Sequence, residues 1–345
     1  MAAHYRTFVV ANPAAGAGSV ARQWPLIERL LRARIPELEY AFTEGPGHGT
    51  LLAREALHAG WEMVVAVGGD GTLNEVVNGF CEQPDPHRCY ALDEQGWITR
   101  RASAPQALSD TAVLGIVPLG TGSDFRRSTG ISGGLRENIE LLGGHETRAI
   151  DLGQIGYLDR RGELATRFFI NISSAGFSGR VVHIANRGWK GAGGRLSFIL
   201  ASLRVLATWR NLDLAVRLDD IEIRGRMLAL VVANGEYFGG GMRIAPGARL
   251  DDGQFEVVVL GDLPRWQLPG LLPGIYRGSH LHHARITRHR ARQVSVRLTA
   301  AAPGLVDLDG EQPGCLPAMW NLYPRALRLK VGAPRPVHPA CAEWD

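Results

Sequence analysis

Two aspartates in this sequence of 345 residues stand in turns of small residues, where a carboxylate can meet a cation bound to phosphate. Asp70 lies in the turn Gly-Gly-Asp-Gly, between a continuous apolar run and a helical pattern, and Asp124 ends the turn Gly-Thr-Gly-Ser-Asp. Backbone N–H groups at the start of a helix bind anions readily. Because no lysine lies near the first turn, its acid suggests that a metal ion accompanies the phosphate. Taken alone, Gly-Gly-Asp-Gly also fits a structural turn with a solvated Asp70.

Strands and helices must position these turns. Four apolar segments are typical of buried parallel strands, at residues 7–11, 38–43, 63–67 and 113–118. Helical patterns follow the first three, over residues 20–34, 51–59 and a third that ends at Phe80. Thr72 is the expected cap of the third helix. These repeated βα units predict an α/β N-terminal domain with an open, mostly parallel sheet and a ligand at its carboxyl edge.

The turn after the first strand, Asn12–Gly18, fits neither the dinucleotide motif nor the P-loop motif. Residues 81–111 are polar, contain prolines and lack periodicity, so they predict an inserted surface loop or hairpin that is mainly solvated. From about residue 149 short alternating segments predict a mainly antiparallel β second domain. A helix is expected near Arg195–Trp209, packed on the sheet of that domain.

Composition and motif content limit the classes of protein to which this chain can belong. A hydrophobic content of 45% and a charged content of 21% are those of a soluble globular chain. Nucleic-acid binding is not expected, because no recognised module or interleaved basic and aromatic pattern occurs. The four cysteines lack metal-ligand spacing and are expected to be free thiols. The start lacks the apolar core of a signal peptide, and no apolar run approaches about 18 residues, so a cytoplasmic location is expected.

Three motifs in sequence resemble the diacylglycerol-kinase-type lipid kinases, a family that includes bacterial diacylglycerol kinases and sphingosine kinases. They are N-P-A-A-G at 12–16, V-G-G-D-G-T-L-N-E at 67–75 and P-L-G-T-G-S-D-F at 118–125. Later segments agree, at 149–153, 169–176, 245–246, 252–253 and 308–311. The resemblance leaves out residues 81–111 and the last dozen residues. Ser123 stands where the family usually has Asn, which could alter the turn more than the metal chemistry.

The resemblance implies ATP and Mg²⁺ as cofactors. It assigns residues 1–148, with a C-terminal return of 321–345, to a nucleotide-binding domain and 149–320 to a lipid-substrate domain. Nucleotide contacts are expected from Asn12, Pro13, Gly16, Thr43, Gly68, Gly69, Asp70, Gly71, Thr72, Asn74 and Thr121. Asp70 and Asp124 would hold the catalytic Mg²⁺.

By the same resemblance, Glu311 in Leu-Asp-Gly-Glu is the general base that accepts the proton of the lipid hydroxyl. The alternative is a hairpin turn with a solvated Glu311, and Asp309 is expected to shape that turn. A second, structural Mg²⁺ would bind Asp252 and the backbone carbonyls of Arg249 and Gln254. A plain turn is the alternative there.

The implied partner is a lipid substrate at the membrane surface. The segment Arg277–Arg292, with five arginines and four histidines, suggests peripheral contact with the inner face of the membrane. A solvated edge of the second domain is the alternative, and a homodimer is left open. Two rival functions remain: an NAD kinase, which shares Gly-Gly-Asp-Gly, and a non-catalytic protein of the same fold that binds nucleotide or lipid. The segments around 245–253 and 308–311 favour a lipid kinase over an NAD kinase.

Overall fold

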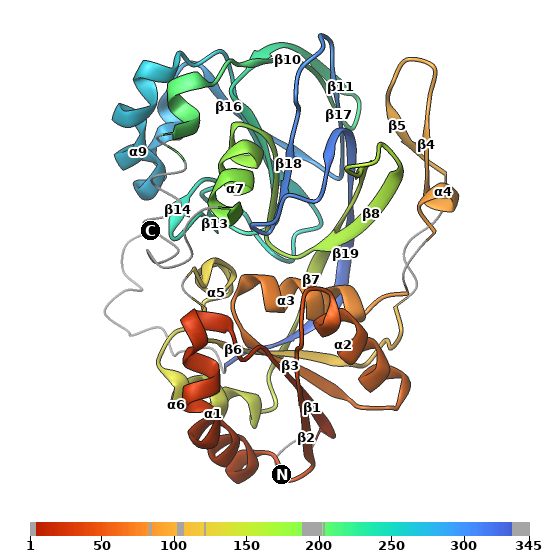
Figure 1. The fold of residues 1–345 in the computed structure, drawn as a ribbon, viewed down its shortest axis with the longest axis vertical. Coiled ribbons are helices and arrows are strands. Elements are labelled where there is room, and N and C mark those ends of the chain that lie inside the picture. The colour runs from red at the N-terminus through yellow and green to blue at the C-terminus, as the bar shows by residue number, and fades with distance from the viewer. Residues whose placement is uncertain are drawn as a thin grey trace, which may run out of the picture.

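The computed structural model describes residues 5–82, 85–101, 107–120, 122–187, 202 and 204–332. Figure 1 shows two lobes stacked along the long axis, a first lobe of helices around a sheet and a β-rich second lobe. The predicted fold class is confirmed: a mostly parallel α/β sheet is followed by a mainly antiparallel β domain. Among the described residues, no helix is both long enough and apolar enough to cross a membrane.

The first lobe is a parallel sheet covered by helices on both faces. Its strands lie in the order β2 (Leu38–Phe42), β1 (Thr7–Ala11), β3 (Met63–Gly68) and β6 (Val113–Pro118). One face packs on α1 (Ala15–Arg34) and α6 (Leu135–Leu142), and the other on α2 (His48–His58) and α3 (Asp70–Gly79). Every residue of β3 is buried, which explains its unbroken apolar sequence.

Two helices start differently from the sequence prediction. Helix α3 begins at Asp70 with Gly69 as its N-cap, so Thr72 is not the cap. The Thr72 hydroxyl instead accepts a hydrogen bond from the side-chain amide of Asn12 at 3.1 Å. Helix α1 is assigned from Ala15, but residues 16–18 have left-handed backbone angles. The tight turn after β1 therefore extends to residue 18 before regular helix begins.

The second lobe is a sandwich of two antiparallel sheets. One contains β7 (Thr147–Leu158), β8 (Leu164–Phe169), β10 (Leu212–Leu218), β11 (Ile221–Met227), β17 (Gln293–Leu298) and part of β19 (Cys315–Lys330). The other has the order β16 (Ile286–Ala291), β15 (Phe255–Leu260), β12 (Ala229–Ala233), β9 (Ile172–Gly176) and β18 (Val306–Leu308). Side chains between the sheets form the core, as where Phe169 stacks on Phe255 at 5.6 Å between ring centroids.

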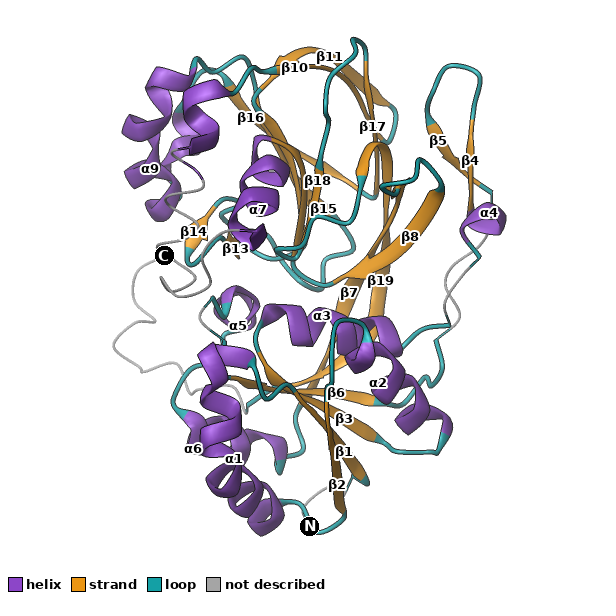
Figure 2. Ribbon diagram, viewed as in Figure 1, coloured by secondary structure: helices purple, strands orange, loops and turns teal. Residues whose placement is uncertain are grey.

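Helices and a small hairpin cover the outer face of the five-stranded sheet. They are α7 (Phe177–Arg187), the 3₁₀ turn η2 (Arg265–Gln267), α9 (Leu268–Arg277), a second 3₁₀ turn η3 (Ser279–His282), and the hairpin of β13 (Tyr237–Phe238) and β14 (Met242–Arg243). Figure 2 shows this cover beside α5 (Asp124–Thr129) of the first lobe. The helix expected at Arg195–Trp209 lies largely outside the described residues, although residues 204–208 are helical.

Two long strands run through both lobes. β7 pairs with β19 in antiparallel fashion, and the end of β19 then lies parallel to β6, with Arg328 opposite Val113. The pairing shifts register between Tyr323 and Leu327, where Arg325 has a φ of +55°. The expected C-terminal return of 321–345 begins within β19, and residues 333–345 lie outside the described residues.

Residues 81–111 include a hairpin, one of the two forms expected, and most of their described residues are at least partly exposed, but two aromatic side chains of the hairpin are buried against the second lobe. The segment contains α4 (Pro86–Cys89), β4 (Tyr90–Leu92) and β5 (Ile98–Arg100). Tyr90 and Trp97 are both 1% exposed. The Tyr90 hydroxyl donates to Gln154 at 3.2 Å, and the Arg217 guanidinium lies 4.0 Å from the Trp97 ring centroid. Isolated aromatic residues in a polar sequence hid this packing. Among the described cysteines, Cys81, Cys89 and Cys315 are free thiols.

Candidate active site

The carboxyl ends of β1, β3 and β6 bring the three small-residue turns together. The Leu119 N–H donates to the Gly68 carbonyl at 2.8 Å, so the turn after β6 lies against the turn after β3. A Cβ on Gly120 would lie 2.4 Å from the Gly69 Cα, closer than nonbonded atoms can approach. Only glycine at residue 120 permits this contact between the two turns.

The turn after β1 is fixed by its asparagine. Asn12 Oδ1 accepts a hydrogen bond from the Ala14 N–H at 3.0 Å, while its amide nitrogen bonds Thr72 at the start of α3. Gly16 has a φ of +57°, and a Cβ there would lie 2.4 Å from the Leu119 carbonyl oxygen. The turns after β1, β3 and β6 therefore hold one another in place. Pro13 continues the turn after Asn12.

A cleft of about 410 Å³ lies where these turns face the second lobe, and we call it the interlobe cleft. The first lobe lines it with Asn12, Ala15, Gly16, Gly69, Asp70, Gly71, Thr72, Gly120, Gly122 and Asp124. The second lobe lines it with Asn171, Ile172, Val182, Phe238, Gly239, Gly240, Asp307, Asp309 and Gly310. Thr43 bonds the Ala11 carbonyl through its N–H at 2.9 Å, next to the turn after β1 but not on the cleft wall. Thr121 lies outside the described residues.

Asp70 and Asp124 converge at Gly122. A Cβ on Gly122 would lie 2.8 Å from Asp70 Oδ2 and 3.7 Å from Asp124 Oδ2. Burial raises the pKa of Asp70 to about 6, and the nearby charge of Asp124 adds to the effect. A divalent cation would relieve this repulsion. The two carboxylates fit Mg²⁺, which takes one or two protein carboxylates and completes its shell with phosphate oxygens and water.

The carboxylate of Asp124 also connects the two lobes. Its Oδ1 accepts from the Arg127 guanidinium at 2.7 Å, and its Oδ2 accepts from the Gly240 N–H at 2.8 Å. Gly240 belongs to the second lobe, in the turn between β13 and β14. Any cation at Asp124 would therefore share this carboxylate with one guanidinium and one backbone donor.

Asp309 is a partly buried carboxylate at the boundary of the lobes, and its hydrogen bonds give it a structural role. It accepts hydrogen bonds from the backbone N–H groups of Ile170, Asn171 and Ile172 at 3.1, 3.2 and 2.9 Å. It also accepts from the side-chain amide of Asn74 on α3 at 2.8 Å. Burial raises the pKa of Asp309, while these donors act in the opposite direction. Asp309 thus shapes the turn, as expected, and also ties α3 to the second lobe.

This arrangement revises the prediction that Asn74 contacts the nucleotide. Asn74 is 1% exposed, and its amide nitrogen also donates to the Phe168 carbonyl at 3.1 Å. Because both bonds point to the second lobe, Asn74 is a connection between lobes and does not line the interlobe cleft. The same carboxylate separates β8 from β9, because the N–H groups of Ile170 and Asn171 between these strands bond Asp309 and not a neighbouring strand.

Asp307 is a further buried acid on the cleft wall. Its carboxylate accepts from the Gly310 N–H at 3.1 Å and from the Ser174 hydroxyl at 3.2 Å. Burial raises the pKa of Asp307 to about 7, and the charge of Asp309 contributes. The sequence analysis passed over this residue because it stands inside an apolar strand without a turn signal.

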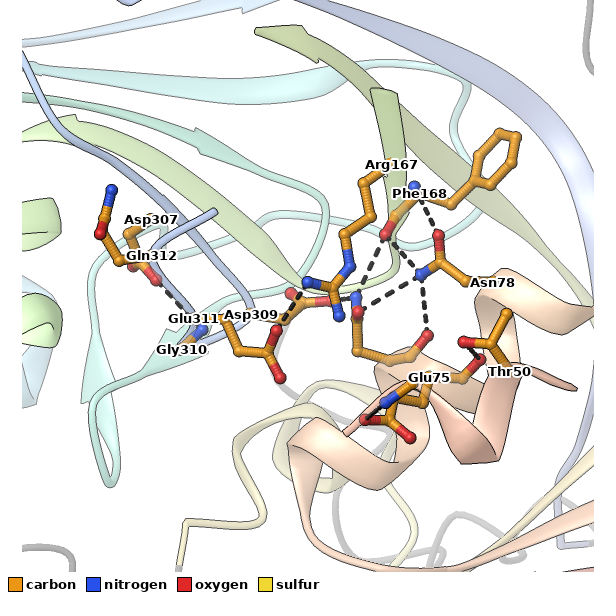
Figure 3. Close-up of polar contacts among 12 residues, drawn as sticks. Thr50, Glu75, Asn78, Arg167, Phe168, Asp307, Asp309, Gly310, Glu311 and Gln312 are labelled. Carbon is orange, nitrogen blue, oxygen red and sulfur yellow. Dashed lines mark hydrogen bonds and ion pairs between the residues drawn. The ribbon is translucent and has the colours of Figure 1, made fainter. Parts of the chain in front are cut away.

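Glu311 lies beside the interlobe cleft and lines a neighbouring side cavity of about 990 Å³, between α2 and β8. A Cβ on Gly71 would lie 3.8 Å from Glu311 Oε1, so the carboxylate borders the Gly-Gly-Asp-Gly turn. Glu311 Oε2 accepts from the Arg167 guanidinium of β8 at 2.6 Å, as Figure 3 shows. Sequence reasoning missed Arg167, because the partners are 144 positions apart and only the fold joins them.

An apolar cavity of about 230 Å³ lies in the second lobe beneath α7 and α9. Its lining includes Val181, Leu228, Val231, Leu268 and Ile275. Phe238 lines both this cavity and the interlobe cleft, and therefore marks the place where they adjoin.

The loop expected to hold a second Mg²⁺ has other interactions. Gln254 N–H donates to Asp252 Oδ1 at 3.2 Å, and Asp252 lies 3.9 Å from the Arg290 guanidinium. Arg249 lies 3.5 Å from Asp251. No group of three or more metal-ligating side chains occurs anywhere in the described part of the chain. The second Mg²⁺ remains a prediction, and ion pairs with a plain turn account for this loop equally well.

Comparison with known proteins identifies relatives of both lobes. Residues 6–155 match the family model of the diacylglycerol kinase catalytic domain, and residues 171–331 match that of the YegS C-terminal NAD kinase beta sandwich-like domain. A diacylglycerol kinase of Staphylococcus haemolyticus is 26% identical over 331 residues, with 96% of this chain and 88% of the relative covered. One of Staphylococcus carnosus is 25% identical over 334 residues, with 96% of each covered.

The fold is also found among solved structures. A crystal structure of a diacylglycerol kinase from Bacillus anthracis superposes with a TM-score of 0.64 and 18% identity. The superposition covers 98% of each chain, so the likeness includes both lobes and their relative placement.

Proposed function

We propose that this chain, which is similar to diacylglycerol-kinase-type lipid kinases in both lobes, transfers the γ-phosphate of Mg-ATP to a lipid hydroxyl. One observation carries the proposal. The interlobe cleft gathers the three small-residue turns of the first lobe and, across from them, the turn at Asp307–Gly310 that leads into Glu311. A divided site of this kind suits phosphoryl transfer, which depends on positioning and charge neutralisation more than on covalent chemistry.

The first lobe would bind the nucleotide. Backbone N–H groups at the start of α3 and in the neighbouring turns suit the phosphates. Asp70 and Asp124 would hold Mg²⁺ against them. Burial is the main cause of the raised pKa of Asp70, and the repulsion from Asp124, which adds to it, is the part that the cation would remove. Thr72 and Asn12, already bonded to each other, would support the same turn.

The second lobe would supply the acceptor and the base. The lipid hydroxyl oxygen forms a bond to the γ-phosphorus, the bond to the β-phosphate oxygen breaks, and the hydroxyl proton passes to Glu311. The products are a lipid phosphate and ADP. Arg167 would hold Glu311 Oε2, leaving Oε1 at the side of Gly71. The apolar cavity that adjoins the cleft at Phe238 suits the acyl part of the acceptor.

The test is transfer of labelled γ-phosphate from ATP with Mg²⁺ to lipids in mixed micelles. Diacylglycerol is the first acceptor to try, because the curated relatives carry that name, and a sphingoid base is the second. Glu311→Gln should lower turnover by roughly 10²–10⁴, the usual contribution of a general base, while nucleotide binding is retained. Glu222→Gln is the matched control, since Glu222 is also partly exposed and paired with arginines, but lies on β11.

Each outcome has a distinct meaning. Normal turnover by Glu311→Gln would remove Glu311 as the base but leave the kinase assignment intact. Absence of any labelled lipid with the wild-type protein and Mg-ATP would overturn the proposed function. Labelling of NAD in place of lipid would support the rival kinase.

A further inference from the structure

Helix α9 and the preceding turn η2 have an apolar side that faces solvent. The sequence from Trp266 to Tyr276 contains no charged residue. Its inner side packs on the second lobe through the buried Leu268 and Ile275. Its outer side nevertheless exposes Trp266 at 75% and Leu272 at 41%. A surface helix normally presents polar residues to water, so this outer side is built for an apolar partner.

The exposed residues form one stripe with basic ends. The exposed residues Trp266, Pro269, Leu272 and Pro273 follow one another at intervals of one to three positions, which places most of them on one side of a helix. Exposed arginines at 265 and 277 flank the stripe. We call this set, residues 265–277, the α9 surface. An apolar stripe between cations is the pattern of a helix that lies in the interface of an anionic bilayer.

The charge around the α9 surface is one-sided. From Leu263 to Val306 the sequence has seven arginines and no aspartate or glutamate. Asp262, just before this stretch, accepts from the Asn211 amide at its carboxylate, at 2.7 Å, and from Arg285 at its backbone carbonyl. The chain segment that contains the α9 surface therefore carries an excess of positive charge, with Arg265 and Arg277 at the ends of the surface itself, and this charge complements anionic headgroups.

In the structure, most of the segment Arg277–Arg292 is less suited to membrane contact than its sequence suggested. Arg288 and Arg290 both bind the buried carboxylate of Glu256, at 2.5 and 2.7 Å, so their charges are largely used inside the protein. Arg277, at the end of α9, belongs to the α9 surface. The contact is therefore centred on an apolar helix and only its border is basic.

The α9 surface is continuous with the apolar cavity. Pro269 and Leu272 are exposed and also line that cavity, so they form its rim. At its other end the cavity meets the interlobe cleft at Phe238. A lipid leaving a bilayer at the rim would stay in apolar surroundings until its polar end reached the acidic cleft.

We propose that the α9 surface docks on the surface of an anionic phospholipid bilayer, with Trp266 and Leu272 inserted among the headgroups. The proposal rests on the lipid kinase function, because it names the place where the substrate leaves the membrane. When the α9 surface faces the bilayer, the cavity rim also lies at the bilayer. The lipid acceptor can then enter the cavity without crossing water.

The experiment compares vesicle binding and activity in the full chain. Vesicles of phosphatidylcholine with and without phosphatidylglycerol are sedimented with wild type, with Trp266→Ala/Leu272→Ser, and with Ile221→Ser. Ile221 is the matched control because it is 55% exposed but lies on β11. The double variant should bind anionic vesicles at least tenfold more weakly, and the control should bind as wild type does. Arg277→Gln should weaken binding to anionic vesicles and leave binding to neutral vesicles unchanged.

Activity separates docking from chemistry. On a short-chain diacylglycerol dispersed as monomers, the single variant Trp266→Ala, whose side chain lies outside the cavity lining, should match wild type, whereas on acceptor in vesicles it should lose at least tenfold. Loss on both substrates, or unchanged vesicle binding, would overturn the docking proposal. A change of oligomeric state with vesicle binding retained would show instead that this face binds a second copy of the chain. If wild type phosphorylates neither form, the proposed function itself fails.

Discussion

Replacement of Asp70 by asparagine should abolish catalysis and yet stabilise the metal-free protein. The Asp70 carboxylate is partly buried and faces Asp124, with no opposite charge bonded to it among the described residues. Its pKa rises from 3.8 to about 6, about two units, and each unit is ~1.4 kcal/mol. The full shift therefore corresponds to about 3 kcal/mol. Since the side chain is open to the cleft, we expect solvent to reduce this to about 1–2 kcal/mol.

The pH dependence of the free energy of unfolding tests the effect of Asp70→Asn more sharply than a single measurement does. Because the folded pKa of Asp70 lies above its unfolded value, its stabilising contribution is complete below about pH 3.8 and is lost as the pH rises through about 6. Asp70→Asn carries no such dependence. The variant should exceed wild type in free energy of unfolding near neutral pH, and the difference should shrink between about pH 6 and 4. Asp307 also titrates in wild type, but it is present in both proteins.

The assay is urea unfolding with a chelator present, at about pH 7.5 and about pH 4.5. Asp124→Asn is the contrasting variant: its carboxylate is paired with Arg127, so its removal should bring no gain in stability. Mg-ATP should stabilise wild type more than Asp70→Asn, because the cation acts through the carboxylate. An Asp70→Asn protein no more stable than wild type near neutral pH, or a difference unchanged at low pH, would refute this reasoning.

Two further replacements test the hydrogen bonds that Asp309 and Glu311 accept. Asp309→Ala leaves three buried N–H groups and the Asn74 amide without their acceptor, and should lower the free energy of unfolding by about 3–5 kcal/mol; a loss below about 1 kcal/mol in urea unfolding would contradict the buried network. Arg167→Gln releases Glu311 Oε2 and should lower kcat by about tenfold with the nucleotide KM unchanged, and Arg167→Lys should restore part of the loss. A rise in KM alone would show that Arg167 acts on the nucleotide rather than on Glu311.

The first lobe could be predicted from sequence because its signals are local. Strand, turn and helix follow one another, and parallel strands bring their carboxyl ends to one edge. Asp70 and Asp124 could therefore be placed together before the structure was known, although they are 54 positions apart. The error at Thr72 has a physical reason: the helix begins two residues earlier, at Asp70, and the Thr72 hydroxyl is bonded to Asn12 in the neighbouring turn.

The second lobe could not be predicted at the same level. The contact between Asn74 and Asp309 spans 235 positions, and no periodicity in either segment points to the other. Tyr90 and Trp97 lie in a segment whose average composition is that of a loop, and their burial depends on strands β7 and β19 and on two arginines from other strands. The apolar outer side of α9 was hidden for the opposite reason, because an apolar helix reads as core until its exposure is known.

The path of β19 determines when the first lobe can be finished during synthesis. The edge of β6 acquires its last neighbour only from residues 328 and 329, near the end of the chain. When the ribosome has released all of the first-lobe helices, that edge still has unpaired N–H and C=O groups, and the whole second lobe remains to be made. The two lobes therefore cannot mature in the order in which they are translated. The first lobe reaches its final form last, so an interrupted chain would lack a complete first lobe as well as a complete second lobe.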